Sequence, residues 1–226
     1  MKRDYLCMQH NKILIKKPLE YSKKDVKISA VTTKYQGFFK LEEYQLSHKL
    51  FSTPLRSKSC NEYSAEFTRE VLERGDAVVV LLYDANQDAL LLIEQFRAGA
   101  LGAEGTPWML EFVAGMFSTN ESPIDVAIRE TKEEANIDLA PGEVKPIMKY
   151  FSSPGGMSEC IHLYWAPFDS CSVISGSVHG LKHENEDILL HLVSRNNALE
   201  LLEMGKICNA ATIIGLQWLA MNYKNL

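Results

Sequence analysis

The stretch GMFSTNESPIDVAIRETKEEANI, residues 115–137, is the most informative part of this chain. Ser122 is a good helix N-cap, Pro123 suits the first helical position, and Asp125 completes a capping-box pattern. At about 100° per residue, five side chains share one face of that helix: Ile124, Ala127, Ile128, Thr131 and Ala135. The stretch therefore predicts a helix over about 123–135 with this face toward the core.

A different face of the predicted helix carries Glu130, Glu133 and Glu134, spaced i, i+3 and i+4. Like charges at these spacings each cost about a few tenths of a kcal/mol. Arg129 borders one edge of the arc, as a possible i,i+4 partner for Glu133. A solvated helix face would explain these glutamates, and so would carboxylates gathered to bind Mg²⁺ or Mn²⁺, which prefer oxygen ligands.

The spacing of the whole stretch favours the metal site. It resembles the Nudix box, G-x5-E-x7-R-E-U-x-E-E-x-G-U, in which U is an apolar residue. Six specified positions match: Gly115, Glu121, Arg129, Glu130, Glu133 and Glu134. Thr131 departs from the apolar position, and Asn136 replaces the glycine at which the family's helix ends with left-handed backbone. Asparagine tolerates that conformation next best, so we expect the geometry to be kept.

The resemblance implies a hydrolase that splits a nucleoside diphosphate linked to another group, with Mg²⁺ as the metal and Mn²⁺ as a possible substitute. It implies that Glu130 and Glu134 bind metal, with the backbone carbonyl of Ala114 as a further ligand. Glu133 would be a ligand or its support, and Arg129 would orient the carboxylates by bidentate pairing.

From about Lys24 to Leu226 the chain resembles, more narrowly, the bacterial ADP-ribose pyrophosphatase subfamily. The resemblance is carried by YQGFF (35–39), REVLERG (69–75), LIEQFRAGA (92–100), PWMLEFVAGM (107–116), SSPGGMSE (152–159), HENEDI (183–188) and GKICNAATIIGLQWLA (205–220). It implies hydrolysis of ADP-ribose to AMP and ribose 5-phosphate. ADP-glucose and GDP-mannose are alternative substrates. A non-catalytic module that senses ADP-ribose is a further alternative, which the retained carboxylates disfavour.

The segment HENEDI, residues 183–188, has two interpretations. Alone it is typical of a solvated acidic loop. By the resemblance, the loop closes over the site, where Glu184 activates the water and Glu186 completes the metal coordination. Glu133 is the competing candidate for the base.

The resemblance also implies residues that contact the substrate. They are Phe38, Phe39, Arg69, Glu70, Arg74, Arg97, Met116, Ser153, Pro154, Gly155 and Glu159. Some of them, including Arg69, Glu70 and Arg74, would reach the site across the interface of a homodimer. The N-terminal region would then serve both dimerisation and substrate recognition.

The apolar runs on both sides of the helix are too short to cross a membrane, and they predict buried strands. Strands are expected at 77–84, 89–97, 108–116, 144–151, 161–168 and 187–193, and helices at about 195–204 and 208–223. This order predicts an α+β fold in which a mixed β-sheet is sandwiched between α-helices, as in the Nudix fold. Alternating segments between Val26 and Leu55 predict a small β-rich N-terminal domain, residues 1–75, before a hydrolase domain, residues 76–226.

Composition excludes some classes of protein. The chain has 226 residues, 46% of them hydrophobic and 23% charged, which is typical of a soluble globular protein. A formal net charge of −5 argues against broad binding to nucleic acid or an anionic membrane. The five scattered cysteines show no C-x-x-C, and no signal peptide or membrane span is evident, so we expect reduced thiols and a cytoplasmic protein.

Overall fold

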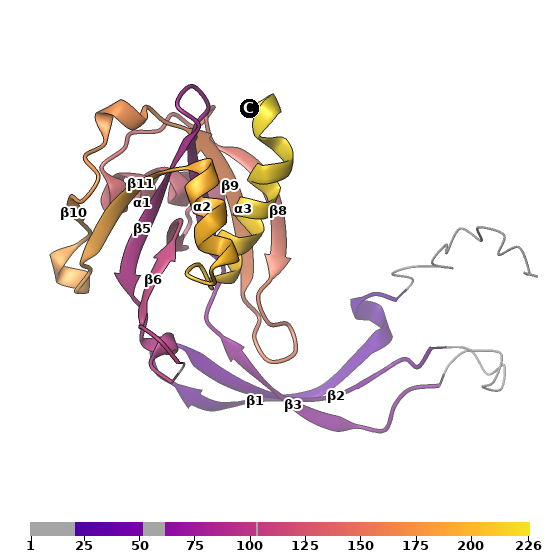
Figure 1. Cartoon of the computed structure of the whole chain (residues 1–226). Coiled ribbons are helices and arrows are strands. Elements are labelled where there is room, and N and C mark those ends of the chain that lie inside the picture. Colours follow the sequence, from indigo (N-terminus) through magenta and orange to yellow (C-terminus); the bar gives the residue numbers. More distant parts are fainter. Residues whose placement is uncertain (1–20, 52–61, 103) are drawn as a thin grey trace, which may run out of the picture. The chain divides into compact units, whose positions relative to one another are not determined.

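The structure is a computed structural model that describes residues 21–51, 62–102 and 104–226 (Figure 1). Contacts between Cα atoms divide the chain into two compact units. The first comprises, among the described residues, 21–35, 41–51 and 62–70, and the second comprises 36–40 and the described residues from 71 to 226. The first 20 residues of the predicted N-terminal domain and the predicted β-structure at 52–55 lie outside the described residues.

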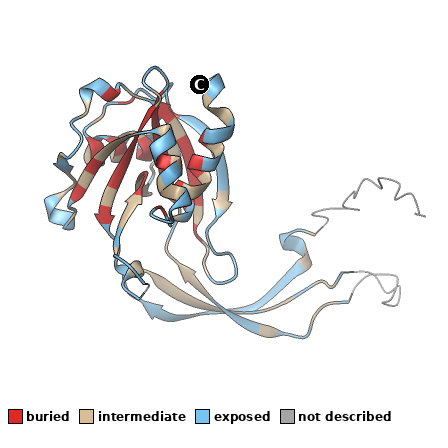
Figure 2. Ribbon diagram, in the orientation of Figure 1, coloured by how far each residue is buried: buried red, intermediate tan, exposed pale blue. Residues whose placement is uncertain are grey.

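A three-stranded sheet with the order β1-β2-β3 follows the short 3-10 helix η1. The bounds are η1 Lys23–Asp25, β1 Val26–Gln36, β2 Lys40–His48 and β3 Phe67–Glu73. Every residue of β1 is exposed, as its pale blue ribbon in Figure 2 shows. Apolar side chains on this strand are therefore left uncovered, among them Ile28, Val31 and Tyr35.

An eight-stranded mixed sheet forms the centre of the second unit. Its path runs β10-β11-β5-β4-β9-β8, while β6 pairs with β5 and β7 with β4. The strands are β4 Ala77–Asp84, β5 Ala89–Phe96, β6 Trp108–Glu111, β7 Val113–Met116, β8 Lys145–Phe151, β9 Cys160–Pro167, β10 Val178–His179 and β11 Ile188–Ser194. Only β4 and β9 pair in parallel among the described strand pairs.

Helices cover both faces of this sheet. They are α1 Pro123–Ala135, α2 Arg195–Glu203 and α3 Ala210–Asn222, and the 3-10 helices are η2 Ala98–Ala100, η3 Ser170–Ser172, η4 Lys182–Glu184 and η5 Tyr223–Asn225. Alternate residues of β4 point to opposite faces, so Val78 packs in the core beside α1 and Val79 in the core beside α2 and α3. Figure 1 shows α2 and α3 in front of the sheet and α1 behind it. The predicted α+β fold, a mixed sheet sandwiched between helices, is confirmed.

The helix α1 begins and ends where the sequence predicts. The Ser122 side chain accepts from the Asp125 backbone N–H, and the Asp125 carboxylate accepts from the Ser122 backbone N–H. Asn136 adopts left-handed backbone with φ 55° and ψ 31°, and its N–H donates to the Lys132 carbonyl. Asparagine thus ends this helix as glycine would, because its backbone tolerates positive φ.

One predicted strand is wrong. Residues 108–116 were expected to form a single strand, but β6 ends at Glu111 and β7 begins at Val113. The interruption falls at buried Phe112, whose N–H donates to the Thr212 hydroxyl of α3 at 3.2 Å instead of to a strand.

This interruption opens the sheet. Strands β4 and β5 pair directly only near the turn that joins them, at Tyr83 with Leu90 and Asp84 with Ala89. Further along, β4 pairs with β7 and β5 pairs with β6, so the two central strands separate. The space between β4 and β5 is therefore bordered by β7 on the β4 side and by β6 on the β5 side.

The described residues contain no helix that is both long and apolar enough to span a membrane.

Candidate active site

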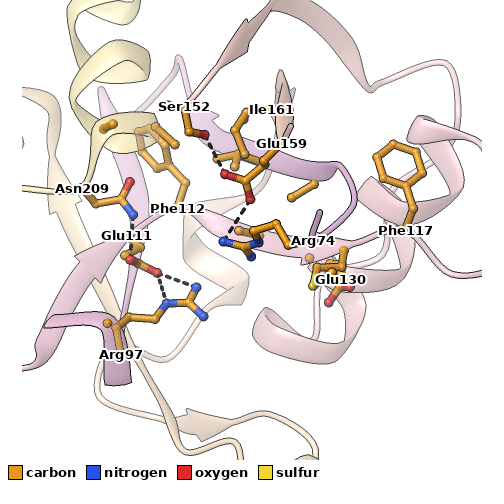
Figure 3. Close-up of a pocket in the computed structure, with 18 of the residues that line it drawn as sticks. Arg74, Arg97, Glu111, Phe112, Phe117, Glu130, Ser152, Glu159, Ile161 and Asn209 are labelled. Atoms are coloured by element: carbon orange, nitrogen blue, oxygen red, sulfur yellow. Dashed lines mark hydrogen bonds and ion pairs between the residues drawn. The ribbon is translucent and has the colours of Figure 1, made fainter. Parts of the chain in front are cut away.

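A pocket of about 790 Å³ lies where β4 and β5 separate (Figure 3). This volume suits a small organic ligand. Eleven of the predicted site residues line it: Phe38, Phe39, Arg74, Arg97, Ala114, Met116, Arg129, Glu130, Glu159, Glu184 and Glu186.

Glu134 is a deeply buried carboxylate of α1 that does not line the pocket itself but lies beneath Ala114, which does. Its side chain lies under β7, where the Ala114 N–H donates to its Oε2 at 3.0 Å, and the residue is 2% exposed. Among the described residues no cation forms an ion pair with it. Burial raises the pKa of Glu134 well above its usual value. The bond from Ala114 and the charge of Arg97 oppose this rise, and the charges of Glu130 and Glu186 add to it.

Glu130 lies one turn before Glu134 on α1, against Gly115 of β7. A Cβ atom at Gly115 would overlap the Glu130 carboxylate, which would have to leave its present position. Burial raises the pKa of Glu130 to about 7; the ion pair with Arg129 opposes the rise, while Glu133 and Glu186 contribute to it. Gly115 therefore leaves room for the carboxylate of Glu130, the first of the candidate metal ligands.

Arg129 holds the surrounding carboxylates in place. Its Nε lies 2.8 Å from Glu121 Oε1, and one terminal nitrogen lies 2.6 Å from Glu130 Oε1 and 3.1 Å from Glu133 Oε2. The hydrogen bond from Arg129 lowers the pKa of Glu121 to about 2. The predicted pairing of Arg129 with Glu133 is present, and a single guanidinium faces three carboxylates.

The segment 180–187 brings two further carboxylates to this end. Gly180 has φ 99° and Asn185 has φ 58°, two left-handed positions that turn the chain sharply. The Leu181 N–H donates to Glu186 Oε2 at 3.1 Å. Glu186 lies close enough to raise the pKa values of both Glu130 and Glu134, while Glu184 lines the pocket with an exposed side chain.

The far end of the pocket is arranged around Glu159. Its Oε1 pairs with Arg74 at 3.1 Å, and its Oε2 accepts from the Ser152 hydroxyl at 2.7 Å. The Arg74 guanidinium also lies 5.2 Å from the centre of the Phe39 ring. The Nε of Arg74 is buried with no hydrogen-bond partner among the described residues, which leaves one donor available for a ligand.

A third group, which the sequence did not predict as part of the site, surrounds Glu111. The Glu111 carboxylate is buried; its Oε2 accepts from Arg97 at 2.9 and 2.7 Å, and its Oε1 accepts from Asn209 at 2.7 Å. Figure 3 shows Glu111 between these two side chains. Its signal in the sequence was a charged residue inside an apolar run, and that of Asn209 was its place as the N-cap of α3.

The remaining predicted residues do not line the pocket. Ser153, Pro154 and Gly155 form an exposed turn between β8 and β9, and the neighbouring Ser152 lines the pocket instead. Glu133 is held by Arg129 on the outer side of α1. Arg69 and Glu70 belong to the first unit and are exposed on β3. Their expected part in a homodimer stays a prediction.

The α1 end fits a hard divalent cation. Glu130, Glu134 and Glu186 offer carboxylate oxygens, the ligand type that Mg²⁺ and Mn²⁺ prefer. Two of these carboxylates have raised pKa values because burial and mutual repulsion disfavour their charged forms. A cation would relieve both effects, and that is the physical case for a metal at this place.

Comparison with known proteins identifies the group to which this arrangement belongs. Residues 73–202 match the NUDIX domain family. The chain is 42% identical over 209 residues to the ADP-ribose pyrophosphatase of Escherichia coli strain K12, covering 92% of this chain and 94% of that protein. It is 40% identical over 209 residues to the ADP-ribose pyrophosphatase of Haemophilus influenzae, covering 91% of each. A GDP-mannose pyrophosphatase of Escherichia coli O1:K1 is 31% identical over 157 residues, 69% of this chain and 78% of that protein.

Proposed function

This chain belongs to the NUDIX domain family, and on that premise we propose that it hydrolyses the diphosphate of ADP-ribose to AMP and ribose 5-phosphate. The chain is a Nudix hydrolase, and the resemblance to ADP-ribose pyrophosphatases extends over nine-tenths of its length. The observation that carries the proposal is one pocket with an excess of carboxylates at one end and paired arginines at the other.

Mg²⁺, with Mn²⁺ as a substitute, is the cation we assign to the α1 end, held by Glu130, Glu134, Glu186 and the Ala114 carbonyl. When bound, such a cation neutralises phosphate charge and makes water easier to deprotonate. The protein orients this end through Arg129, which fixes Glu130 directly, and through the Ala114 N–H, which fixes Glu134. Both carboxylates are therefore positioned before any ligand arrives.

Glu184 is the base in this proposal, and its carboxylate accepts the proton of the attacking water. Two observations favour it over Glu133. Glu184 lines the pocket and is exposed, so water reaches it freely. Glu133 does not line the pocket, and its carboxylate is engaged in a 3.1 Å ion pair with Arg129.

The other end of the pocket binds the nucleotide and the sugar. The Arg97 guanidinium is held in place by two contacts with Glu111 Oε2. Its remaining N–H groups can donate to phosphate oxygens. Arg74 has an unsatisfied Nε, and Phe38 and Phe39 offer aromatic faces for adenine. Glu159 and Ser152 suit the hydroxyl groups of a ribose, because a carboxylate accepts and a hydroxyl both donates and accepts.

A substrate panel tests this proposal. Equal concentrations of ADP-ribose, ADP-glucose and GDP-mannose are hydrolysed in Mg²⁺, and the products are identified by chromatography and by mass spectrometry after reaction in ¹⁸O-labelled water. We expect ADP-ribose to have the highest kcat/KM and to yield AMP and ribose 5-phosphate. A higher kcat/KM for GDP-mannose would overturn the choice of substrate and leave the reaction type in place.

A homodimer in the cytoplasm is the state in which we propose that the enzyme acts. The N-terminal three-stranded sheet leaves Ile28 exposed on one face of β1 and Val31 and Tyr35 exposed on the other, and exposed apolar side chains gathered on one element are typical of a surface covered by a partner. Arg69 and Glu70 on β3 would then reach the partner's site. The thiols of Cys160, Cys171 and Cys208 are free, in keeping with a reducing compartment. Sedimentation equilibrium of the full chain tests the dimer, and a monomer mass at micromolar concentration would contradict it.

A further inference from the structure

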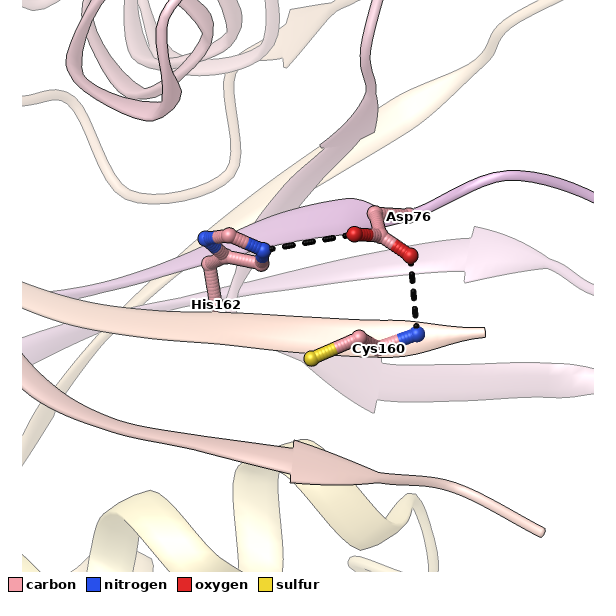
Figure 4. Close-up of side chains that lie close together, drawn as sticks. All are labelled: Asp76, Cys160 and His162. Atoms are coloured by element: carbon pink, nitrogen blue, oxygen red, sulfur yellow. Dashed lines mark hydrogen bonds and ion pairs between the residues drawn. The ribbon is translucent and has the colours of Figure 1, made fainter. Parts of the chain in front are cut away.

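Asp76, Cys160 and His162 lie together where strands β4 and β9 of the central sheet begin (Figure 4). Their carboxylate, thiol and imidazole ligand atoms all lie within 4.8 Å of one another. None of the three lines the pocket described above. Among the described residues this is the one group of histidine, cysteine and acidic side chains that comes so close together.

The register of the sheet brings these residues together. Cys160 and His162 are two positions apart at the start of β9, so their side chains leave the same face of the strand. Asp76 directly precedes β4, and β4 pairs in parallel with β9 so that Ala77 lies opposite Ile161. Asp76 therefore stands beside Cys160, and the Cys160 N–H donates to Asp76 Oδ1 at 3.1 Å.

The ligand atoms differ in kind from those at the α1 end of the pocket. One sulfur, one imidazole nitrogen and one carboxylate oxygen form a borderline set that suits Zn²⁺, whereas carboxylates alone suit Mg²⁺. Sites with three protein ligands leave a fourth position for water. The two sites on this chain would thus select different metals by ligand type.

The distance between Asp76 and His162 fits two ligands of one ion. His162 Nε2 lies 3.4 Å from Asp76 Oδ2, which is longer than the roughly 2.7–2.9 Å of a strong charge-assisted hydrogen bond. Ligands on a tetrahedral zinc ion, with bonds of about 2.0–2.3 Å, are separated by about 3.3–3.8 Å. The pair is spaced as two ligands of one ion are.

Burial provides an independent reason for a ligand at this place. The His162 side chain is 9% exposed and packs edge-on against the Phe117 ring at 5.2 Å. Its Nδ1 is buried with no hydrogen-bond partner among the described residues, and its Nε2 has only the long contact to Asp76. A buried imidazole nitrogen with only a long contact is unfavourable, and a cation bound at Nε2 would replace the long contact to Asp76 by a ligand bond, while Nδ1 keeps no partner among the described residues. Asp76 is 45% exposed and leaves a path from solvent.

We propose that Asp76, Cys160 and His162 form a second metal site, for a borderline divalent ion such as Zn²⁺. Binding converts the Cys160 thiol to the thiolate and releases its proton to solvent, so affinity rises with pH. The ion would link Asp76, which precedes β4, to the start of β9. The Asp76 backbone carbonyl also accepts a hydrogen bond from the Phe117 N–H at 3.4 Å. This site does not depend on the proposed hydrolysis of ADP-ribose.

Cobalt substitution tests the site on the full chain without any measurement of turnover. The protein is freed of metal with a chelator and titrated with Co²⁺, and then Zn²⁺ is added in competition. We expect the near-ultraviolet charge-transfer absorption that a thiolate–cobalt bond produces, saturating at one ion per chain and abolished by Zn²⁺. The carboxylates of the α1 end contain no sulfur and cannot produce this absorption.

Four variants locate the ligands. Cys160→Ser should abolish the charge-transfer absorption, and the control Cys208→Ser, at an exposed cysteine of the α2–α3 connection, should retain it. His162→Gln and Asp76→Asn should each weaken cobalt binding by about 10-fold or more. Asp76→Asn keeps the size of a half-exposed side chain, so it folds even if a change at buried His162 does not; circular dichroism checks both.

The proposal is overturned by any of three results. Wild-type protein shows no thiolate–cobalt absorption, or Cys160→Ser retains it, or folded Asp76→Asn binds cobalt with unchanged affinity. In each case the three residues would only pack together at the start of β4 and β9, with a long carboxylate–imidazole contact. Loss of ADP-ribose hydrolysis in another experiment would have no bearing on these outcomes.

Discussion

The two ends of the active-site pocket contain similar side chains but differ in how their charges are balanced. At the α1 end, Arg129 is the one guanidinium in ion-pair contact with Glu121, Glu130 and Glu133, while buried Glu134 has no cationic partner among the described residues. At the far end, each carboxylate has its own arginine. Arg74 pairs with Glu159, and Arg97 pairs with Glu111.

We propose that this difference gives each end a separate task. The carboxylates of the α1 end would bind a cation, so this end would set the rate of the chemical step. The paired arginines are rigid donors, so the far end would set how well the substrate binds. Substitutions at the α1 end should therefore lower kcat, and substitutions at the far end should raise KM.

Glu134→Gln should have the largest effect, a fall in kcat on the order of 10³-fold. The amide keeps the size of the buried side chain and its contact with β7, but it removes the charge that binds the metal. Steady-state hydrolysis in Mg²⁺ measures this, with Glu203→Gln at the exposed end of α2 as the control. Wild-type turnover in Glu134→Gln would refute the metal assignment.

Glu184→Gln should lower kcat by about 10²-fold or more while the metal affinity stays within about threefold of wild type. The reason is that the proposed function assigns the attacking water to Glu184 and the metal to Glu130, Glu134 and Glu186. The same two measurements on Glu133→Gln complete the comparison. A larger loss of kcat in Glu133→Gln, with Glu184→Gln unchanged, would transfer the role of base to Glu133.

Gly115→Ala should lower kcat by about 10²-fold, because the new Cβ displaces the Glu130 carboxylate from its position and small misplacements are costly. Gly102→Ala is the matched control, since a Cβ at Gly102 meets nothing within 4 Å. If both alanine variants retain wild-type kcat, the close packing of β7 on Glu130 is not needed for catalysis.

Glu111→Gln tests the far end of the pocket. Arg97 loses a charged partner while Asn209 keeps a hydrogen-bonding neighbour, so we expect KM for ADP-ribose to rise about tenfold with little change in kcat. Glu143→Gln, at an exposed glutamate near the start of β8, is the control. A fall in kcat at unchanged KM would mean that Glu111 serves the chemical step instead.

The smallest expected effect is on stability without metal. Burial raises the pKa of Glu130 from 4.5 to about 7, so the folded state binds a proton that the unfolded state has released. The resulting stability is complete below about pH 4.5 and is lost as the pH rises through about 7. In chelator, the thermal midpoint of wild type should fall by a few degrees more than that of Glu130→Gln between about pH 5 and pH 8. Equal shifts in both proteins would contradict this.

The sequence predicted the α1 end in detail because a single helix and the strand before it supply most of it. Fixed spacing on a helix determines which side chains share a face, so the clustering of Glu130, Glu133 and Glu134 followed from residue numbers, while their roles came from the family resemblance. Asn136 was correctly predicted to end the helix. The loop carboxylate Glu186 was reached through the family resemblance, since spacing alone does not relate it to α1.

The far end could be predicted only in part, because its residues come from elements distant in sequence. Glu111 and Asn209 are 98 positions apart, and they meet because β6 ends at Phe112 and the N-terminus of α3 packs there. The sequence predicted one continuous strand over 108–116 and so gave no reason to expect this contact. Exposed Ser153 was predicted in place of Ser152, since no local pattern shows which residue of a turn faces a pocket.

Metal binding to the free enzyme tests the division of the pocket most directly. Calorimetric titration with Mg²⁺, without substrate, compares the wild type with Glu134→Gln and Glu111→Gln. We predict that Glu134→Gln loses at least about 100-fold in affinity for Mg²⁺ and that Glu111→Gln binds as the wild type does. Equal Mg²⁺ affinity in the wild type and Glu134→Gln, or equal losses in both variants, would contradict the separation of a metal-binding end from a substrate-binding end.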